Sequence, residues 1–155
     1  MTDTAPRTAK EVRIERTLPA PIEEVFAAWT HPDSMGMWLS PMGHAEVEAD
    51  PRVHGRFRVV MVGDDMTIEH TGEYLVFDPP RLLSFTWRSP YTGPEPSVVT
   101  VSLTPEGEAT RLLLVHERLP ADQVTSHAGG WGSMIDRLTV LLVSAVSKQT
   151  GRSTT

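Results

Sequence analysis

The sequence predicts an α+β domain in which a curved antiparallel sheet of about six to seven strands wraps around one long C-terminal helix. Short segments of alternating apolar and polar residues recur along the chain, which is typical of half-buried strands. Most of the 13 prolines stand between these segments, and they mark the ends of elements because proline lacks a backbone donor. One long stretch near the C-terminus has helical spacing instead, and it is large enough to cover the apolar face of the sheet.

The first two elements are a strand and a short helix. Over residues 11–18, Val12 and Ile14 alternate with charged residues, which predicts a strand with one buried face. Pro21 and the two glutamates that follow it suit the first turn of a helix over residues 21–29. Apolar residues recur there at spacings of three and four, so this helix has one apolar face. We expect residues 31–43 to be irregular.

Six further strands complete the predicted sheet. Turn residues such as Gly63-Asp64-Asp65 and Asp78-Pro79-Pro80 connect them over short distances, which favours antiparallel hairpins and a meander. The expected strands cover residues 44–50, 55–62, 67–77, 82–88, 97–104 and 109–118.

The C-terminal helix is expected from Asp122 to about Ser147. Three glycines between 129 and 132 interrupt its apolar pattern, and each costs about 1 kcal/mol relative to alanine inside a helix. We therefore expect a break near residues 129–130; the alternative is an unbroken helix pressed closely against the sheet. The predicted single domain covers residues 11–148, between a flexible N-terminus (1–10) and a frayed tail (149–155).

The composition excludes several classes of protein. With 39% hydrophobic and 22% charged residues, the 155-residue chain can bury the core of one domain. The net charge of −6 argues against nucleic acid as a partner, because phosphate backbones bind clustered basic residues. The absence of cysteine excludes disulfides and thiolate chemistry. Residues 1–10 lack the apolar stretch of a secretory signal and no run is long enough to span a membrane, so we expect no membrane partner and a cytoplasmic location.

Four blocks of turn and core residues occur in an order shared with a known family. They are Asp33-Ser-Met-Gly-Met-Trp38 with Pro41-Met-Gly43; Ala49-Asp-Pro-Arg-Val-His-Gly-Arg-Phe57; Thr71-Gly-Glu-Tyr74 with Asp78-Pro-Pro-Arg-Leu82 and Phe85-Thr-Trp87; and Leu112-Leu-Leu-Val-His116 with Gly130-Trp131. Together they resemble the Hsp90-ATPase-activator homologue family of START/Bet v 1-like domains. His54 stands where the family's motif has its first glycine. The likeness covers roughly residues 11–146 and implies the helix-grip (Bet v 1-like) fold.

The resemblance also implies a cavity, because relatives bind sterols, lipids, polyketides or plant hormones between sheet and helix. We therefore expect a small hydrophobic molecule as the partner. The cavity that binds it would be lined by aromatic, thioether and aliphatic side chains at inward positions. The expected ligand-binding residues are Trp38, Phe57, Val59, Met61, Tyr74, Phe85, Trp87, Val101, Leu114, His116, Trp131, Met134, Ile135 and Leu138. The eukaryotic activators of this family carry an additional N-terminal domain that contacts Hsp90. Because the 155 residues leave no room for that domain, an Hsp90-type chaperone is not an expected partner. The chain could form a homodimer.

Few residues suggest catalysis. His116 lies among the inward residues of its strand and could act as a general base, and the Tyr74 hydroxyl could reach a ligand carbonyl. A structural hydrogen bond is the alternative for both. The six histidines are scattered without metal-ligand spacing, so we expect no metal, and no motif calls for a cofactor. Arg56 and Arg58 are expected on the solvent face.

Three functions fit these observations. The favoured one is binding of a small hydrophobic or amphipathic ligand between sheet and C-terminal helix. The first alternative is an enzyme of the polyketide cyclase/dehydratase type that uses the same cavity, and the second is a co-chaperone or other interaction protein. Met35, Met37 and Met42 around Trp38 could form a lid over the cavity, or could lie under the edge of the sheet.

Overall fold

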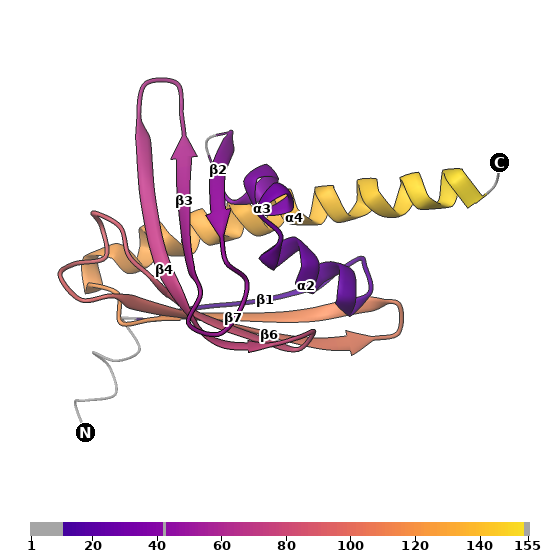
Figure 1. Ribbon diagram of the computed structural model, residues 1–155, viewed down its shortest axis with the longest axis horizontal. Coiled ribbons are helices and arrows are strands. Elements are labelled where there is room, and N and C mark those ends of the chain that lie inside the picture. Colours follow the sequence, from indigo (N-terminus) through magenta and orange to yellow (C-terminus); the bar gives the residue numbers. More distant parts are fainter. Residues whose placement is uncertain (1–10, 42, 154–155) are drawn as a thin grey trace.

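A seven-stranded antiparallel sheet wraps around one long helix in the computed structural model, which describes residues 11–41 and 43–153, the last nine by their backbone alone (Figure 1). The elements are β1 (Val12–Leu18), α2 (Ile22–Thr30), α3 (Pro32–Trp38), β2 (His44–Ala49), β3 (Arg56–Val62), β4 (Thr67–Asp78), β5 (Leu82–Trp87), β6 (Ser97–Glu106), β7 (Ala109–Glu117), the short 3₁₀ helix η1 (Ala121–Gln123) and α4 (Val124–Ser153). The predicted α+β helix-grip architecture is confirmed.

The sheet runs in the order β1-β7-β6-β5-β4-β3-β2, so β1 joins the last strand and every other neighbour is a hairpin partner. The register of β4 against β5 shifts between Tyr74 and Val76, which is a β-bulge. Bulges bend a strand and increase its twist. In Figure 1, β2, β3 and β4 accordingly turn away from the plane of β1, β6 and β7, and α4 crosses behind them.

The expectation of an irregular segment at 31–43 is wrong for residues 32–38, which form α3. Pro32 occupies the first turn, where its missing N–H costs nothing, and Asp33 places a negative charge near the helix N-terminus. Met35 and Trp38 are three residues apart and form its buried face. Gly36 lets the helix approach β2, because a Cβ there would lie 2.7 Å from the carbonyl oxygen of Ala45.

The expected break at Gly129–Gly130 is also wrong, because α4 is one helix through Ser153. Its buried face, made by Trp131, Met134, Ile135 and Leu138, outweighs the low helix propensity of the glycines. Close packing does not explain them either: a Cβ added at Gly129, Gly130 or Gly132 would meet no atom within 4 Å. The expected flexible segment at residues 1–10 lies outside the described residues, and the backbone of the expected tail is helical as far as Ser153.

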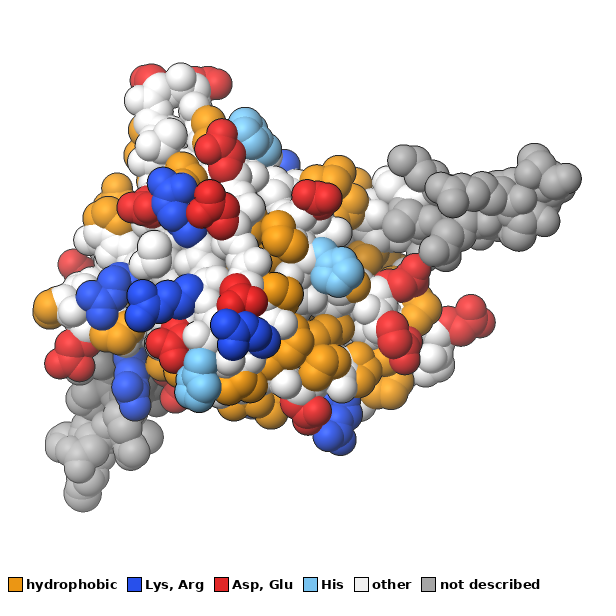
Figure 2. All heavy atoms as spheres, in the orientation of Figure 1, with side chains coloured by type: hydrophobic (Ala, Val, Ile, Leu, Met, Phe, Trp, Pro, Cys, Tyr) orange, Lys and Arg blue, Asp and Glu red, His pale blue; other side chains and the backbone are white. Residues whose placement is uncertain are grey.

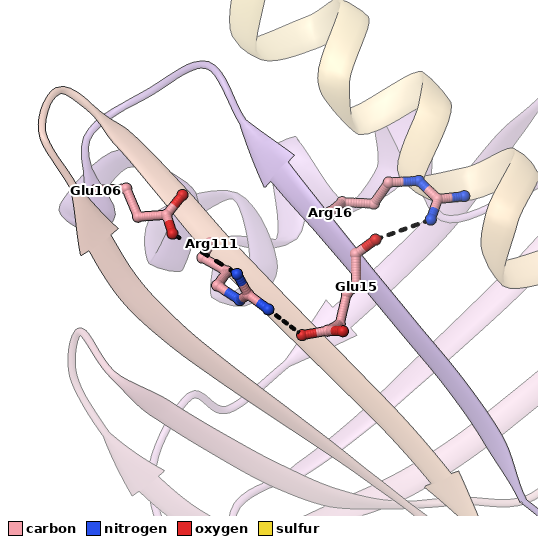
Figure 3. A network of polar contacts seen from close by, with 4 residues as sticks. All are labelled: Glu15, Arg16, Glu106 and Arg111. Atoms are coloured by element: carbon pink, nitrogen blue, oxygen red, sulfur yellow. Dashed lines mark hydrogen bonds and ion pairs between the residues drawn. The ribbon is translucent and has the colours of Figure 1, made fainter.

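Charged side chains on the outer face join β1 to β6 and β7. Arg111 on β7 donates to Glu15 of β1 at 2.5 Å and lies 3.8 Å from the Glu106 carboxylate, while Arg16 donates to the backbone oxygen of Glu15 (Figure 3). About half of each ion-pairing side chain is exposed, so such pairs contribute only about 0–1 kcal/mol each. The buried face of the sheet, rather than this network, stabilises the fold.

Replacing Gly72 with alanine tests the close packing of β4. A Cβ at Gly72 would lie 2.0 Å from the carbonyl oxygen of Thr86 and 2.3 Å from the Phe57 ring, so strand or ring must move. We expect Gly72→Ala to lower the free energy of unfolding by about 1–3 kcal/mol. Gly129→Ala is the matched control and should raise it by about 0.5–1 kcal/mol, since its methyl group meets open space inside a helix. Urea denaturation measures both, and equal effects would contradict the packing of β4.

Candidate functional site

A cavity of about 240 Å³ lies between the sheet and the first half of α4. Its walls come from β3, β4, β5, the loops at 41 and 91, η1 and α4. They are made by Pro41, Met61, Ile68, His70, Trp87, Tyr91, Gln123, Ser126, His127, Gly130, Trp131 and Met134. Gly130 lies four residues from both Ser126 and Met134, which also line the cavity, and a Cβ at Gly130 would meet no atom within 4 Å. We therefore expect a larger residue at this position to project over the cavity.

Aromatic rings form one wall of the cavity. Trp87 and Trp131 lie with their ring centroids 5.3 Å apart, and His70 stacks on Trp87 at 4.5 Å with 30° between the planes. Both tryptophans are almost fully buried, whereas Tyr91 at the rim is 46% exposed. Large flat rings give an apolar ligand much contact area without losing many rotamers.

A chain of buried hydrogen bonds fixes this wall. Trp131 Nε1–H donates to Nδ1 of His116 at 2.9 Å, so the proton of the neutral imidazole is on Nε2. Nε2–H donates to Ser97 Oγ at 2.7 Å, and the Ser97 hydroxyl donates to the backbone oxygen of Trp87 at 2.5 Å. The chain therefore links α4 through β7 and β6 to β5.

His116 has no ring nitrogen free for a substrate, because both take part in this chain. Its side chain is fully buried, and burial, with smaller contributions from His127 and His70, lowers its pKa to about 3. A group that stays neutral and fully bonded positions Trp131 and is not placed to act as a general base.

Tyr74 lines a second, much smaller cavity of about 10 Å³. Its other walls are made by Trp29, Met35, Leu39, Phe57, Phe85 and Trp87, and Trp87 lines both cavities. The Tyr74 hydroxyl is buried without a hydrogen-bond partner, and burial raises its pKa to about 12. It does not line the larger cavity.

The wall of the larger cavity also contains polar side chains, which are those of His70, Gln123, Ser126 and His127. His70 is 5% exposed, and burial together with the neighbouring His127 lowers its pKa to about 4. Contacts of the ring with the backbone of Ile68 and Val59 oppose this lowering of the pKa, although no hydrogen bond of ordinary geometry reaches Nδ1. Nδ1 of His127 lies 2.9 Å from the backbone oxygen of Gln123.

Arg137 fastens α4 to the loop that carries Pro41. Its Nη2 donates to the backbone oxygen of Met37 at 3.2 Å and also to that of Gly43. Pro41 lies between these two carbonyls in the chain and forms part of the cavity wall. Met35 and Met37 do not form a lid over the larger cavity. Met35 is buried and lines the small cavity, Met37 is 59% exposed, and Met42 lies outside the described residues.

The structure distributes the expected ligand-binding residues over three places. Met61, Trp87, Trp131 and Met134 line the larger cavity. Phe57, Tyr74 and Phe85 line the smaller one together with Trp87. Core residues that reach neither cavity are Val59, Val101, Leu114, His116, Ile135, Leu138 and Trp38, whose indole donates to the Ala28 carbonyl at 3.0 Å.

Sequence reasoning did not place the polar residues His70, Gln123, Ser126 and His127 in the cavity wall. Alternation along β4 could have found His70, because residues 68, 70 and 72 share the inward face of that strand with Tyr74. Helical spacing could have found His127, which lies four residues before Trp131 on α4. Pro41 and Tyr91 come from loops, and no periodic signal identifies them.

Three further hollows, of about 390, 530 and 330 Å³, lie elsewhere among the described residues. No group of three or more metal-binding side chains comes together in this part of the chain. Arg56 and Arg58 are exposed as expected, and Arg58 pairs with Glu69. Figure 2 shows basic side chains interspersed with acidic ones on the face drawn. None of the helices described has the length and apolar character needed to cross a bilayer.

A curved antiparallel sheet that grips a long helix around an apolar cavity defines the class of helix-grip, Bet v 1-like domains. The family model described as Activator of Hsp90 ATPase homolog 1-like protein matches residues 19–143, and the chain belongs to this family. The resemblance found in the sequence is thereby confirmed. A search of curated proteins gave no match.

Solved structures from several organisms share the fold. Protein CV1439 from Chromobacterium violaceum is 25% identical, with a TM-score of 0.75, over 85% of this chain and 96% of that one. Protein MLL2253 from Mesorhizobium loti is 28% identical, with a TM-score of 0.73, over 87% and 98%. PFC0360w, described as an HSP90 activator from Plasmodium falciparum, is 22% identical, with a TM-score of 0.71, over 86% and 96%, which shows the fold alone.

The stability of the protein should fall with acid because two buried histidines are neutral. The pKa values of His70 and His116 in the folded state, about 4 and 3, lie below the ordinary value of 6.5, so the unfolded chain binds more protons between these limits. Their contribution is complete above pH 6.5 and is lost as the pH falls towards 4, at no more than about 2.7 kcal/mol per pH unit for both. Urea denaturation across this range measures the slope. His70→Phe should make it shallower, and an unchanged slope would contradict a neutral buried His70.

Removing the Ser97 hydroxyl tests the buried hydrogen-bond chain. Ser97→Ala leaves His116 Nε2–H without its partner, which should cost about 1–3 kcal/mol of unfolding free energy. The control is Ser84→Ala, because Ser84 only shares a partly buried contact with Thr100 at 3.1 Å and should lose less than about 1 kcal/mol. The NMR signal of the Trp131 indole N–H should shift only in the Ser97 variant. Equal losses of unfolding free energy in the Ser97 and Ser84 variants would show that the buried hydrogen bonds do not hold the aromatic wall of the cavity.

Proposed function

We propose that this protein binds a small, predominantly apolar molecule in the larger cavity, between the sheet and α4. The observation that carries the proposal is an aromatic-walled space of about 240 Å³ with a glycine of the covering helix in its wall. The fold supports it, since domains of this kind commonly bind hydrophobic ligands. A cytoplasmic location and the absence of a required cofactor belong to the same proposal.

The energetics are adequate for such a ligand. The cavity holds roughly ten to twenty non-hydrogen atoms. Burying about 200 Å² of apolar ligand surface against Trp87, Trp131 and Met134 would contribute about 5 kcal/mol before the costs of association. Because the wall is fixed by hydrogen bonds before the ligand arrives, little ordering has to accompany binding.

The two alternative functions have weaker support. The proposed catalytic groups do not converge on the larger cavity: His116 is bonded at both nitrogens and Tyr74 lines the smaller space. The co-chaperone alternative rests on family membership and on the shared fold of a Plasmodium falciparum protein described as an HSP90 activator. No described residue favours either one.

Filling the cavity from α4 tests the proposal. Gly130→Leu places a side chain in the open space, while Gly129→Leu places the same side chain on an exposed position of the same helix. With the neutral fluorescent probe N-phenyl-1-naphthylamine, we expect the affinity of the Gly130 variant to fall by about tenfold or more, and that of the Gly129 variant to match the parent protein. Both should fold at least as stably as the parent.

Native mass spectrometry of the purified protein supplies a second measurement. An organic molecule retained by the parent and by the Gly129 variant, but lost from the Gly130 variant, would support binding in this cavity. If the parent protein binds neither the naphthylamine probe nor any retained molecule, the proposed function is wrong.

A further inference from the structure

The side chain of Trp87 lines both the larger cavity and the small one. Among the described residues it is the member that the two walls have in common. It is the last residue of β5, and it follows Phe85 on the same face of that strand, because alternate residues of a strand point the same way. A residue that belongs to both walls lies where the two spaces approach each other.

The rings around Trp87 form two groups. His70 and Trp131, whose ring centroids lie 4.5 and 5.3 Å from that of Trp87, line the larger cavity and not the small one. Phe57 and Phe85, each with its centroid at 6.1 Å, line the small cavity and not the larger one. The indole therefore contacts the walls of both spaces.

The packing around Trp87 holds its ring in one position. The side chain is 2% exposed, and the ring stacks on His70 with 30° between the planes. The backbone is fixed as well, because its carbonyl oxygen accepts the Ser97 hydroxyl at 2.5 Å. Protein interiors are close-packed, so a large ring can rotate only by displacing its neighbours. A ligand in the larger cavity therefore meets a rigid surface at this side chain.

We propose that Trp87 limits the length of the ligand by closing the larger cavity towards the small one. The inference rests on the proposed function and names its ligand class, which is compact ring compounds rather than molecules with long alkyl chains. Space for an extension lies behind the indole, where the small cavity is lined by the adaptable side chain of Met35 and by Leu39. A smaller residue at position 87 joins the two spaces and admits a longer ligand.

A homologous series of 4-alkylphenols, from ethyl to decyl, tests the inference in the parent protein. Each methylene that is buried in an apolar site raises the affinity about fourfold. Displacement of N-phenyl-1-naphthylamine should show an affinity that rises with chain length, reaches its maximum within the series and then rises no further. The reason is that the additional methylenes meet the Trp87 ring and stay outside the cavity.

Replacing Trp87 with leucine removes the closing ring but keeps an apolar side chain. We expect Trp87→Leu to move the maximum to chains longer by about two or more methylenes, and to raise the affinity for 4-decylphenol about tenfold or more. Phe77→Leu is the matched control, because Phe77 contacts Tyr74 at 5.6 Å but lines neither cavity. It should leave the maximum at the chain length found for the parent.

Two further variants keep the test sharp. Trp87→Phe retains an aromatic ring, so it disturbs folding less than Trp87→Leu, and should move the maximum in the same direction by a smaller amount. Leu39→Phe, combined with Trp87→Leu, fills the small cavity from the opposite wall and should return the maximum to the chain length of the parent. Circular dichroism shows whether each variant is folded.

The outcomes separate the two proposals. If the folded variants at position 87 keep the parent's maximum, if Phe77→Leu moves it equally far, or if the parent's affinity still rises at decyl, the inference is overturned while apolar ligand binding stands. If neither the alkylphenols nor N-phenyl-1-naphthylamine bind the parent protein, both proposals fail together.

Discussion

The hydrogen-bond chain from Trp131 to Trp87 is the interaction on which the rest of the site depends. A long helix that lies across a curved sheet could slide or roll if only apolar side chains held it, because apolar contacts have little directional preference. The chain through His116 and Ser97 gives the pairing a direction, since each group must meet one specific partner. It also fixes Trp131, whose ring lies 5.3 Å from that of Trp87, as part of one aromatic wall of the cavity.

An open cavity in a domain of this size is a compromise between packing and function. Filling the space would stabilise the protein, and the small cavity beneath Trp87 shows how tightly the neighbouring core is packed. Gly130 works against filling, because it is a lining residue without a side chain and a Cβ there would meet no atom within 4 Å. Proteins commonly accept such costs where a ligand binds.

Much of the fold could be predicted from the sequence, because every strand carries its own alternation and proline or glycine stands at most of its ends. The expected strands agree with the structure to within two residues at each boundary. The errors fell where local preference competes with tertiary packing. Gly129 and Gly130 predict a break on propensity alone, yet the buried face of α4 keeps the helix intact. Residues 32–38 were too few for a clear period.

The site was harder to predict because lining a cavity depends on small differences of position among residues that are all inward. Leu114 and Met61 both point towards the interior, but only Met61 reaches the larger space. His116 appeared chemically suggestive on its own strand, and its partners on β6 and α4 became visible only once the chain was folded. His70 and His127 belong to different elements, so no local pattern joins them.

The two carbonyls that accept from Arg137 fasten one part of the cavity wall to α4. Pro41 lies between Met37 and Gly43 in the chain, so this part of the wall is held to the helix. On the other side, half-exposed Tyr91 belongs to the loop between β5 and β6, away from this anchor. If the proposed ligand is wider than the cavity, the wall therefore yields more easily at Tyr91, which Arg137 does not hold, than at Pro41.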